Sequence, residues 1–201
     1  MAKARKQSDR GEKLLKYGLG LMSQEGLGGV TLGRLAQHAG MSKSGVFAHF
    51  SSKVEVQIAL LDYTAQFSAA CVIEPTFVEP PGLGRLQALV SNWFGWAGRA
   101  GLPGGCPVAA AMFELDDVEG PVRDRVLQLE AEWRGLLAQV TREAMASGEL
   151  RTDLDAEQFV FELCGIYLVH HVSSRFVRDP SSDARAQTAF DALLARARST
   201  N

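Results

Sequence analysis

The sequence predicts an all-α protein of about nine helices, with an N-terminal helix-turn-helix followed by a larger helical body. Apolar residues recur at helical spacing along nearly all of the 201 residues, and no segment shows the strict alternation of a half-buried strand. Glycines and prolines separate the periodic segments. A hydrophobic content of 46% is enough to bury a core in one or two domains.

Four helices are expected in the N-terminal part. They span residues 9–24, 31–39, 42–50 and 51–75. Thr31 and Ser42 suit the N-cap positions of the second and third helices, because their hydroxyls accept hydrogen bonds from free backbone N–H groups. Gly40 breaks the second helix, and Pro75 is expected to stop the fourth. One face of the first helix is predicted to hold Leu14, Gly18, Leu21 and Met22, and the inner face of the fourth Val54, Ile58, Leu61, Ala65 and Val72.

Five more helices are expected beyond the linker at residues 80–82. They span residues 83–98, 107–115, 121–146, 156–178 and 183–198. The glycine-rich stretch 98–105 lacks the Lys-Ser/Thr pair of a phosphate-binding loop, so it is interpreted as a flexible connection. Residues 159–169 are apolar nearly all round, which predicts burial on more than one side of that helix.

Charge is distributed unevenly along the chain, although the net charge is only −2. Residues 1–53 hold nine Lys or Arg and three acidic residues, a net +6, so the remainder carries −8. A basic head on an acidic body favours a polyanionic partner at the N-terminal end. The alternative is a basic tail that only aids solubility.

The segment from Thr31 to Lys53 has the layout of a helix-turn-helix. Ala36 is small where the two helices cross, and Gly40 allows the tight turn between them. Leu35 and Val46 supply the apolar contact that fixes the angle, so that the second helix can enter a major groove. An ordinary corner between two helices has similar spacing and remains the alternative.

This segment, followed by a long amphipathic helix, resembles the DNA-binding domain of TetR-type repressors. The shared pattern is the Thr-capped helix, Ala-x-x-x-Gly at the turn, the run 47–50 (Phe-Ala-His-Phe) and Ser51-Ser52-Lys53. The Gly-Cys-Pro turn at 105–107 and the junction 148–153 also look like TetR-family ligand domains. The resemblance implies a homodimer, a palindromic operator on double-stranded DNA, and release from that DNA by a small molecule.

The resemblance also implies roles for individual residues. Thr31, His49 and Lys53 correspond to phosphate contacts, and Ser42, Lys43, Ser44 and Gly45 to the base-facing surface. Phe47 stands where the family usually has a tyrosine whose hydroxyl contacts phosphate. Because Phe47 has no hydroxyl, we expect an apolar contact there instead, for example with a thymine methyl group.

A ligand pocket in a helical body needs apolar walls and a few polar groups. The pocket candidates are Trp93, Trp96, Cys106, Phe113, Trp133, Tyr167 and His170. Trp93 and Trp96, three residues apart on one predicted helix, are expected to share a face. Core packing is the alternative for each aromatic residue, and a buried inert thiol is the alternative to a redox-active Cys106.

The sequence as a whole favours a sequence-specific DNA-binding transcriptional regulator, a repressor released by a small apolar or aromatic ligand. We expect a DNA-binding domain at residues 1–53 and a ligand-binding and dimerisation domain at residues 54–201, with the last two helices forming the dimer interface. No cofactor, metal site, catalytic motif or membrane span is expected, and the three separate cysteines suit a cytoplasmic protein. The rival interpretations are a helical enzyme and an architectural DNA-binding protein without a ligand.

Overall fold

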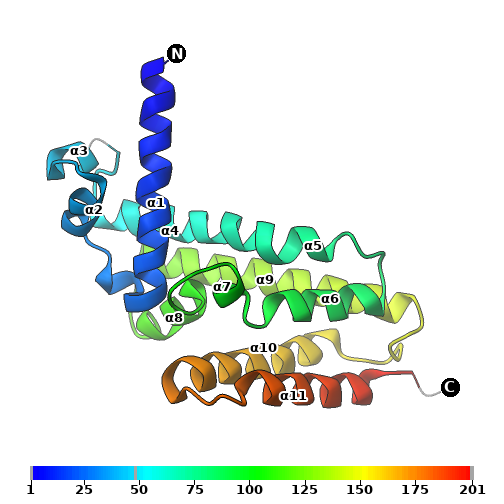
Figure 1. The fold of residues 1–201 in the computed structure, drawn as a ribbon. Coiled ribbons are helices and arrows are strands. Elements are labelled where there is room, and N and C mark those ends of the chain that lie inside the picture. The colour runs from blue at the N-terminus through cyan, green and yellow to red at the C-terminus, as the bar shows by residue number, and fades with distance from the viewer. Residues whose placement is uncertain (1, 48, 200–201) are drawn as a thin grey trace. The chain divides into compact units, whose positions relative to one another are not determined.

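The computed structural model describes residues 2–47 and 49–199, with side chains from residue 11 onward (Figure 1). The α-helices are α1 (Ala2–Gly29), α2 (Leu32–Ala39), α3 (Lys43–Phe47), α4 (Lys53–Ser68), α5 (Glu74–Thr76), α6 (Leu83–Trp93), α7 (Trp96–Arg99), α8 (Pro107–Glu114), α9 (Pro121–Ala146), α10 (Ala156–Val172) and α11 (Ser182–Ala197). Two π-helical segments, η1 (Ala69–Ile73) and η2 (Ser173–Val177), continue α4 and α10. Within the described ranges the β-pairing is a single bridge between Leu150 and Arg198, so the predicted all-α class is confirmed.

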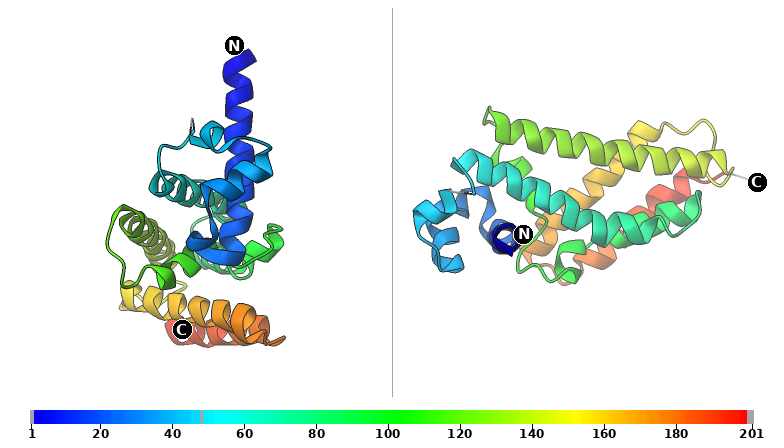
Figure 2. Two further views of the ribbon diagram at one scale, coloured as in Figure 1. Left: turned by 90° about the vertical axis from the view of Figure 1, so that its left-hand side faces the viewer. Right: turned by 90° about the horizontal axis from the view of Figure 1, so that it is seen from above.

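The chain divides into two compact units. The first contains residues 1–67 and 97–128, and the second contains residues 68–96 and 129–201. In the second unit, α10 and α11 pack side by side as an antiparallel pair, visible in both views of Figure 2. The predicted domain boundary after residue 53 coincides with the start of α4 but not with this division by compactness, and it stays a prediction.

Helix α1 buries the face that its periodicity predicts. Leu14 and Met22 are fully buried, and Gly18 and Leu21 are buried with them. A side chain at Gly18 would collide with Leu60 of α4, because an added Cβ would lie 2.6 Å from a methyl carbon of that leucine. The helix is longer than predicted at both ends, with a kink at Gly26, where φ is 73°. Glycine is required there because other residues are strained at positive φ.

Helix α4 differs from the prediction in two ways. Val54 is 40% exposed, whereas Leu61 and Val72 are buried as predicted, and the buried face also contains Val56, Leu60 and Thr64. The helical path also continues past Pro75, which lies inside α5. The π turn of η1 ends at Ile73, two residues before this proline, and a local π adjustment is one way in which a helix tolerates proline.

The predicted helix over residues 83–98 is broken in the structure. Helix α6 ends at Trp93, and Gly95 adopts a φ of 70° before α7 begins at Trp96. Trp93 and Trp96 therefore lie on different helices, and the expectation that they share one helical face was wrong. The helical spacing rule fails because it assumes a continuous helix through Gly95.

The continuous helical stretch Lys53–Thr76 is long and apolar enough, by length and composition alone, to cross a membrane. No such stretch was expected from the sequence, because polar residues interrupt its apolar run. Two of those polar residues pair with protein groups. Gln57 donates to the carbonyl of Leu27 at 3.2 Å, and Asp62 accepts from Arg125 at 2.6 Å. These contacts fit a helix that packs against protein.

Candidate functional site

The helix-turn-helix is held together by a small apolar core and local hydrogen bonds. Leu35 and Ala36 of α2 and Val46 of α3 are almost completely buried, as the sequence predicts. Gly40 takes the left-handed conformation (φ 60°) at the end of α2, and the Met41 amide donates to the Ala36 carbonyl at 2.9 Å. These bonds satisfy carbonyl groups at the end of α2 and set the tight turn into α3.

The start of α3 presents short polar side chains. Ser42, Lys43 and Ser44 are exposed, and Gly45 is half-buried. The Ser42 hydroxyl accepts from the Gly45 amide at 3.1 Å, so it caps α3 as predicted, and it also lies 2.9 Å from the Ser44 hydroxyl. The Phe47 ring is 49% exposed at the end of α3, where it is available for an apolar contact. This surface can meet the floor of a DNA groove without a bulky obstruction.

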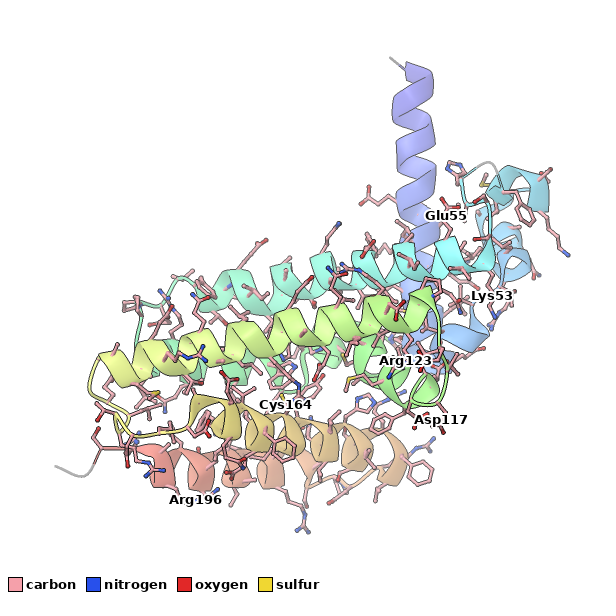
Figure 3. All side chains as sticks on the ribbon, turned by 180° about the vertical axis from the view of Figure 1, so that it is seen from behind. Lys53, Glu55, Asp117, Arg123, Cys164 and Arg196 are labelled. Carbon is pink, nitrogen blue, oxygen red and sulfur yellow. The ribbon has the colours of Figure 1, made fainter. Side chains whose placement is uncertain are left out.

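The residues with implied phosphate contacts flank α3 in the same compact unit. Thr31 caps α2, since its hydroxyl accepts from the Arg34 amide at 3.2 Å. His49 is half-buried in the segment between α3 and α4, and Lys53 is exposed at the first position of α4 (Figure 3). Phe50, which follows His49, is buried.

Two further features support the helix-turn-helix. Ser52 caps α4 by accepting from the Glu55 amide at 3.1 Å, and the Glu55 carboxylate accepts from Ser51 in return. These hydrogen bonds hold the pKa of Glu55 below its usual value. The Ser-x-x-Glu spacing is the sequence signal of such a capping box. The second feature is the stacking of His38 of α2 on Tyr17 of α1, with ring centroids 3.4 Å apart.

A set of hydrogen bonds fastens the end of α1 to α8 and to the loop before it. The Glu114 carboxylate accepts from the backbone amides of Leu27 and Gly28 at 3.0 and 3.1 Å. The Ser23 carbonyl accepts from the Gly105 amide at 3.0 Å. Gly104 lies so close that an added Cβ would be 1.7 Å from the Ser23 carbonyl oxygen. The segment 97–128 is thereby joined to the helix-turn-helix within one compact unit.

In the second compact unit, aromatic side chains from α6, α9 and α10 form one cluster. The Trp93 ring stacks on Tyr167 with centroids 4.0 Å apart, and it meets Trp133 at 5.0 Å in an edge-on arrangement. Phe94, just after α6, stacks on His170 at 5.7 Å. The indole nitrogen of Trp133 is buried and has no hydrogen-bond partner among the described residues. A buried donor of this kind is unusual, because leaving it unpaired is costly.

Four of the seven pocket candidates belong to this cluster: Trp93, Trp133 and Tyr167 by direct ring contact, and His170 through Phe94. The His170 imidazole is fixed by Asp183, with 2.7 Å between Nε2 and the carboxylate oxygen. Trp96 is buried beyond the break at Gly95. Cys106 and Phe113 belong to the other compact unit, and Phe113 is 53% exposed. The structure therefore does not bring the seven residues into one group.

Of the cysteines, Cys164 on α10 is buried, whereas Cys71 and Cys106 are half-buried. Burial raises the pKa of the Cys164 thiol to about 11, so the thiol is protonated and unreactive near neutral pH. Among the described residues, no three His, Cys, Asp or Glu side chains are grouped so that they would hold a metal ion.

Comparisons with known proteins match this arrangement along most of the chain. Residues 14–60 match a family described as "Bacterial regulatory proteins, tetR family", and residues 82–190 match one described as "Tetracyclin repressor-like, C-terminal domain". The chain belongs to the TetR family. It is therefore a DNA-binding transcriptional regulator with an N-terminal helix-turn-helix and a C-terminal helical domain.

Individual relatives of this TetR-family regulator are distant in sequence. The Nucleoid occlusion factor SlmA of Escherichia coli is 29% identical over 187 residues, covering 90% of this chain and 92% of SlmA. A TetR-family regulator from Cytophaga hutchinsonii has a TM-score of 0.86 at 20% identity, with 98% of both chains covered. A transcriptional regulator from Saccharomonospora viridis, solved in complex with choline, has a TM-score of 0.79 at 17% identity and full coverage of both chains. At these identities the two structures show the fold alone.

Proposed function

We propose that this TetR-family regulator is a homodimeric repressor that leaves a palindromic operator when a small apolar or aromatic ligand binds. The observation that carries the ligand proposal is the aromatic cluster with the unpaired indole N–H of Trp133. Genomic DNA as the partner places the protein in the cytoplasm. Regulation through a binding equilibrium needs no catalytic step, so we assign it no enzymatic activity.

On the DNA side, the proposal assigns groove reading to the exposed first turn of α3. Ser42, Lys43 and Ser44 project from that turn, and Phe47 offers an apolar surface to a thymine methyl. Thr31, His49 and Lys53 lie on either side of α3 in the chain, where contacts to the two walls of the groove fix the register. Gly45 contributes because it has no side chain, so the base-facing surface of α3 can approach the bases closely.

On the ligand side, the cluster offers flat ring faces and one free donor. A ligand that enters beside Trp93 and Trp133 would gain ring contacts, and an acceptor atom on it would satisfy the Trp133 N–H. The choline complex of the Saccharomonospora viridis regulator makes a quaternary ammonium compound a useful member of the test panel. Aromatic ring faces attract such cations.

The dimer proposal rests on apolar side chains that a single chain leaves in solvent. Phe161 and Val169 of α10 are 65% and 66% exposed, and Val172 is 40% exposed. Helix α11, which packs beside α10, also leaves several alanines exposed. Two copies of this helix pair would bury these side chains in a four-helix interface, the arrangement that a two-fold symmetric dimer favours.

The deciding experiment begins with the operator. DNA selected from a random pool by the purified protein would be sequenced. The affinity of the protein for this DNA would then be measured in the presence of apolar, aromatic and quaternary ammonium compounds. We expect an active compound to change tryptophan fluorescence and lower operator affinity together. The Trp133→Phe variant keeps an aromatic ring but removes the N–H, so it should weaken the response to a ligand with an acceptor while leaving DNA affinity in the absence of ligand unchanged.

A second candidate function is an architectural DNA-binding protein that responds to no ligand. Its supporting observation is the close stacking of Trp93 on Tyr167, at 4.0 Å, which leaves no room for a flat molecule between these two rings. If no compound in the panel alters tryptophan emission or DNA affinity, the ligand-responsive function is wrong and the architectural function replaces it.

A further inference from the structure

The N-terminal end of α1 carries a dense positive charge that the family match does not include. Residues 2–10 contain Lys3, Arg5, Lys6 and Arg10 against a single acid, Asp9, a net charge of +3 in nine residues. The match to the DNA-binding family begins only at residue 14. This charge is therefore additional to the helix-turn-helix, and it belongs to a chain whose net charge is −2.

The backbone places this segment beside the DNA-contacting elements. Helix α1 begins at Ala2, and in Figure 1 it continues past α2 and α3 toward the N-terminus. Both helices belong to the same compact unit as α1. At Gly11 the helix runs next to the end of the helix-turn-helix, because a Cβ on Gly11 would lie 3.9 Å from Nδ1 of His49. Residues 2–10 extend from that point, next to a residue with an implied phosphate contact.

We propose that residues 2–10 form a basic arm that binds the DNA phosphate backbone beside the phosphates contacted by the helix-turn-helix. This inference rests on the proposed operator binding and extends its footprint. Nine helical residues span about 13 Å at 1.5 Å per residue. Phosphates of one strand recur about every 3.4 Å along the duplex axis, so an arm of that length passes several of them.

The arm contributes affinity without sequence preference. Lys and Arg side chains bind phosphate oxygens on any sequence, and each such contact releases condensed counterions. The arm therefore strengthens binding to operator and to unrelated DNA by the same factor, and its contribution falls steeply with salt. The arm lengthens the stretch of DNA that the protein contacts, whereas discrimination between DNA sequences depends on α3.

The test compares the wild-type chain with two arm variants on operator and scrambled duplexes across a range of salt concentrations. In the first variant the four basic residues are replaced by glutamine (Lys3→Gln, Arg5→Gln, Lys6→Gln and Arg10→Gln). In the second, charge is kept by exchanging Lys and Arg (Lys3→Arg, Arg5→Lys, Lys6→Arg and Arg10→Lys). Circular dichroism and thermal unfolding serve as the check that both variants are folded.

We expect the glutamine variant to lose affinity equally for both duplexes. Its slope of log affinity against log salt should fall by about 0.9 for each lost phosphate contact. The charge-preserving variant should retain wild-type affinity and slope. Unchanged binding by the glutamine variant, or a loss confined to the operator, would overturn the arm while leaving operator binding intact. If the wild-type protein binds neither duplex, the proposed regulator function fails together with the arm.

Discussion

Two lysines of the helix-turn-helix occupy positions that suit different kinds of DNA contact. Lys43 is the first residue of α3, the helix that we propose enters the groove, whereas Lys53 is the first residue of α4. Both side chains are exposed. The Lys43 stem passes near Gly33 of α2, since its Cε lies 3.5 Å from the position of a Cβ on Gly33. From there its ammonium group is positioned for a contact either with base edges or with the phosphate that we propose Thr31 binds.

Alanine substitution separates these two roles. Lys53→Ala should weaken binding to all sequences by a similar factor and reduce the salt slope by about 0.9 unit for each bound subunit, because each subunit loses one phosphate contact. Lys43→Ala should narrow the gap between operator and random DNA by about 1–3 kcal/mol if the side chain makes a base contact. Salt titrations of both variants on operator and scrambled duplexes provide the measurement. If Lys43→Ala loses the same affinity for both duplexes, Lys43 contacts a phosphate and not a base.

Residue-scale features with local causes are those that the sequence predicts best. The caps at Thr31 and Ser42 and the left-handed Gly40 depend on neighbours within four residues, and each is found as expected. The burial of Trp133 Nε1 depends on residues far away in the chain, and no local pattern reports it. Val54 was misplaced because several apolar residues of α4 suit more than one helical face.

At the scale of elements, Glu114 joins the end of α8 to the end of α1. Its two carboxylate oxygens accept from the Leu27 and Gly28 amides, which follow the kink at Gly26. Because the kink interrupts the regular helical bonds, these amides depend on a side-chain acceptor, as at a capped helix N-terminus. An added Cβ at Gly26 would lie 1.8 Å from the same carboxylate, so the glycine also makes room for it.

Replacing Glu114 by alanine should lower the free energy of unfolding by about 1 kcal/mol, the usual cost of losing a helix cap. Glu114→Gln retains one acceptor oxygen and should lose less. Urea denaturation of these variants provides the measurement. Glu119→Ala, an exposed acid in the turn before α9, is the control for the change of charge. If the alanine variants at positions 114 and 119 unfold at the same urea concentration, the carboxylate does not stabilise this junction.

The boundaries of an element could be predicted where one residue decides them. The predictions were wrong where a glycine or proline and the surrounding helical pattern favour different outcomes. Gly95 interrupts the predicted helix 83–98 between Phe94 and Trp96, because its positive φ redirects the chain despite continuous helical periodicity. Pro75 shows the opposite case. The proline was expected to end its helix, but the π turn of η1 accommodates it and the helix continues to Thr76.

At the scale of the whole molecule, the two candidate sites differ in how far the sequence predicts them. The helix-turn-helix lies within residues 31–53, so spacing along the chain is sufficient to locate it. The aromatic cluster joins Trp93, Trp133 and Tyr167 from three helices, and only tertiary packing brings them together. The sequence supplies these three among seven candidates, but it gives no reason to separate them from Cys106 and Phe113.

The exposed face of α10 is the surface that we propose forms the dimer interface. Val169 is 66% exposed in a single chain, so we expect Val169→Glu to leave the fold of each subunit intact. In a dimer built on α10 and α11, the same substitution would place a charge in a dry interface, which is strongly unfavourable. We expect wild-type protein to sediment as a dimer at micromolar concentration and Val169→Glu to sediment as a monomer. Circular dichroism should be the same for both.

Val78→Glu is the matched control, because Val78 is 82% exposed on the segment between α5 and α6 and is not part of the proposed interface helices. It introduces the same charge and should remain dimeric. The Val169→Glu monomer should also bind a palindromic operator far more weakly, since two linked reading helices bind with an effective concentration that one helix lacks. If the Val169→Glu protein is still a dimer, the dimer interface is not formed by α10. A monomeric wild-type protein at micromolar concentration would contradict the dimer itself and, with it, the expectation of a palindromic operator.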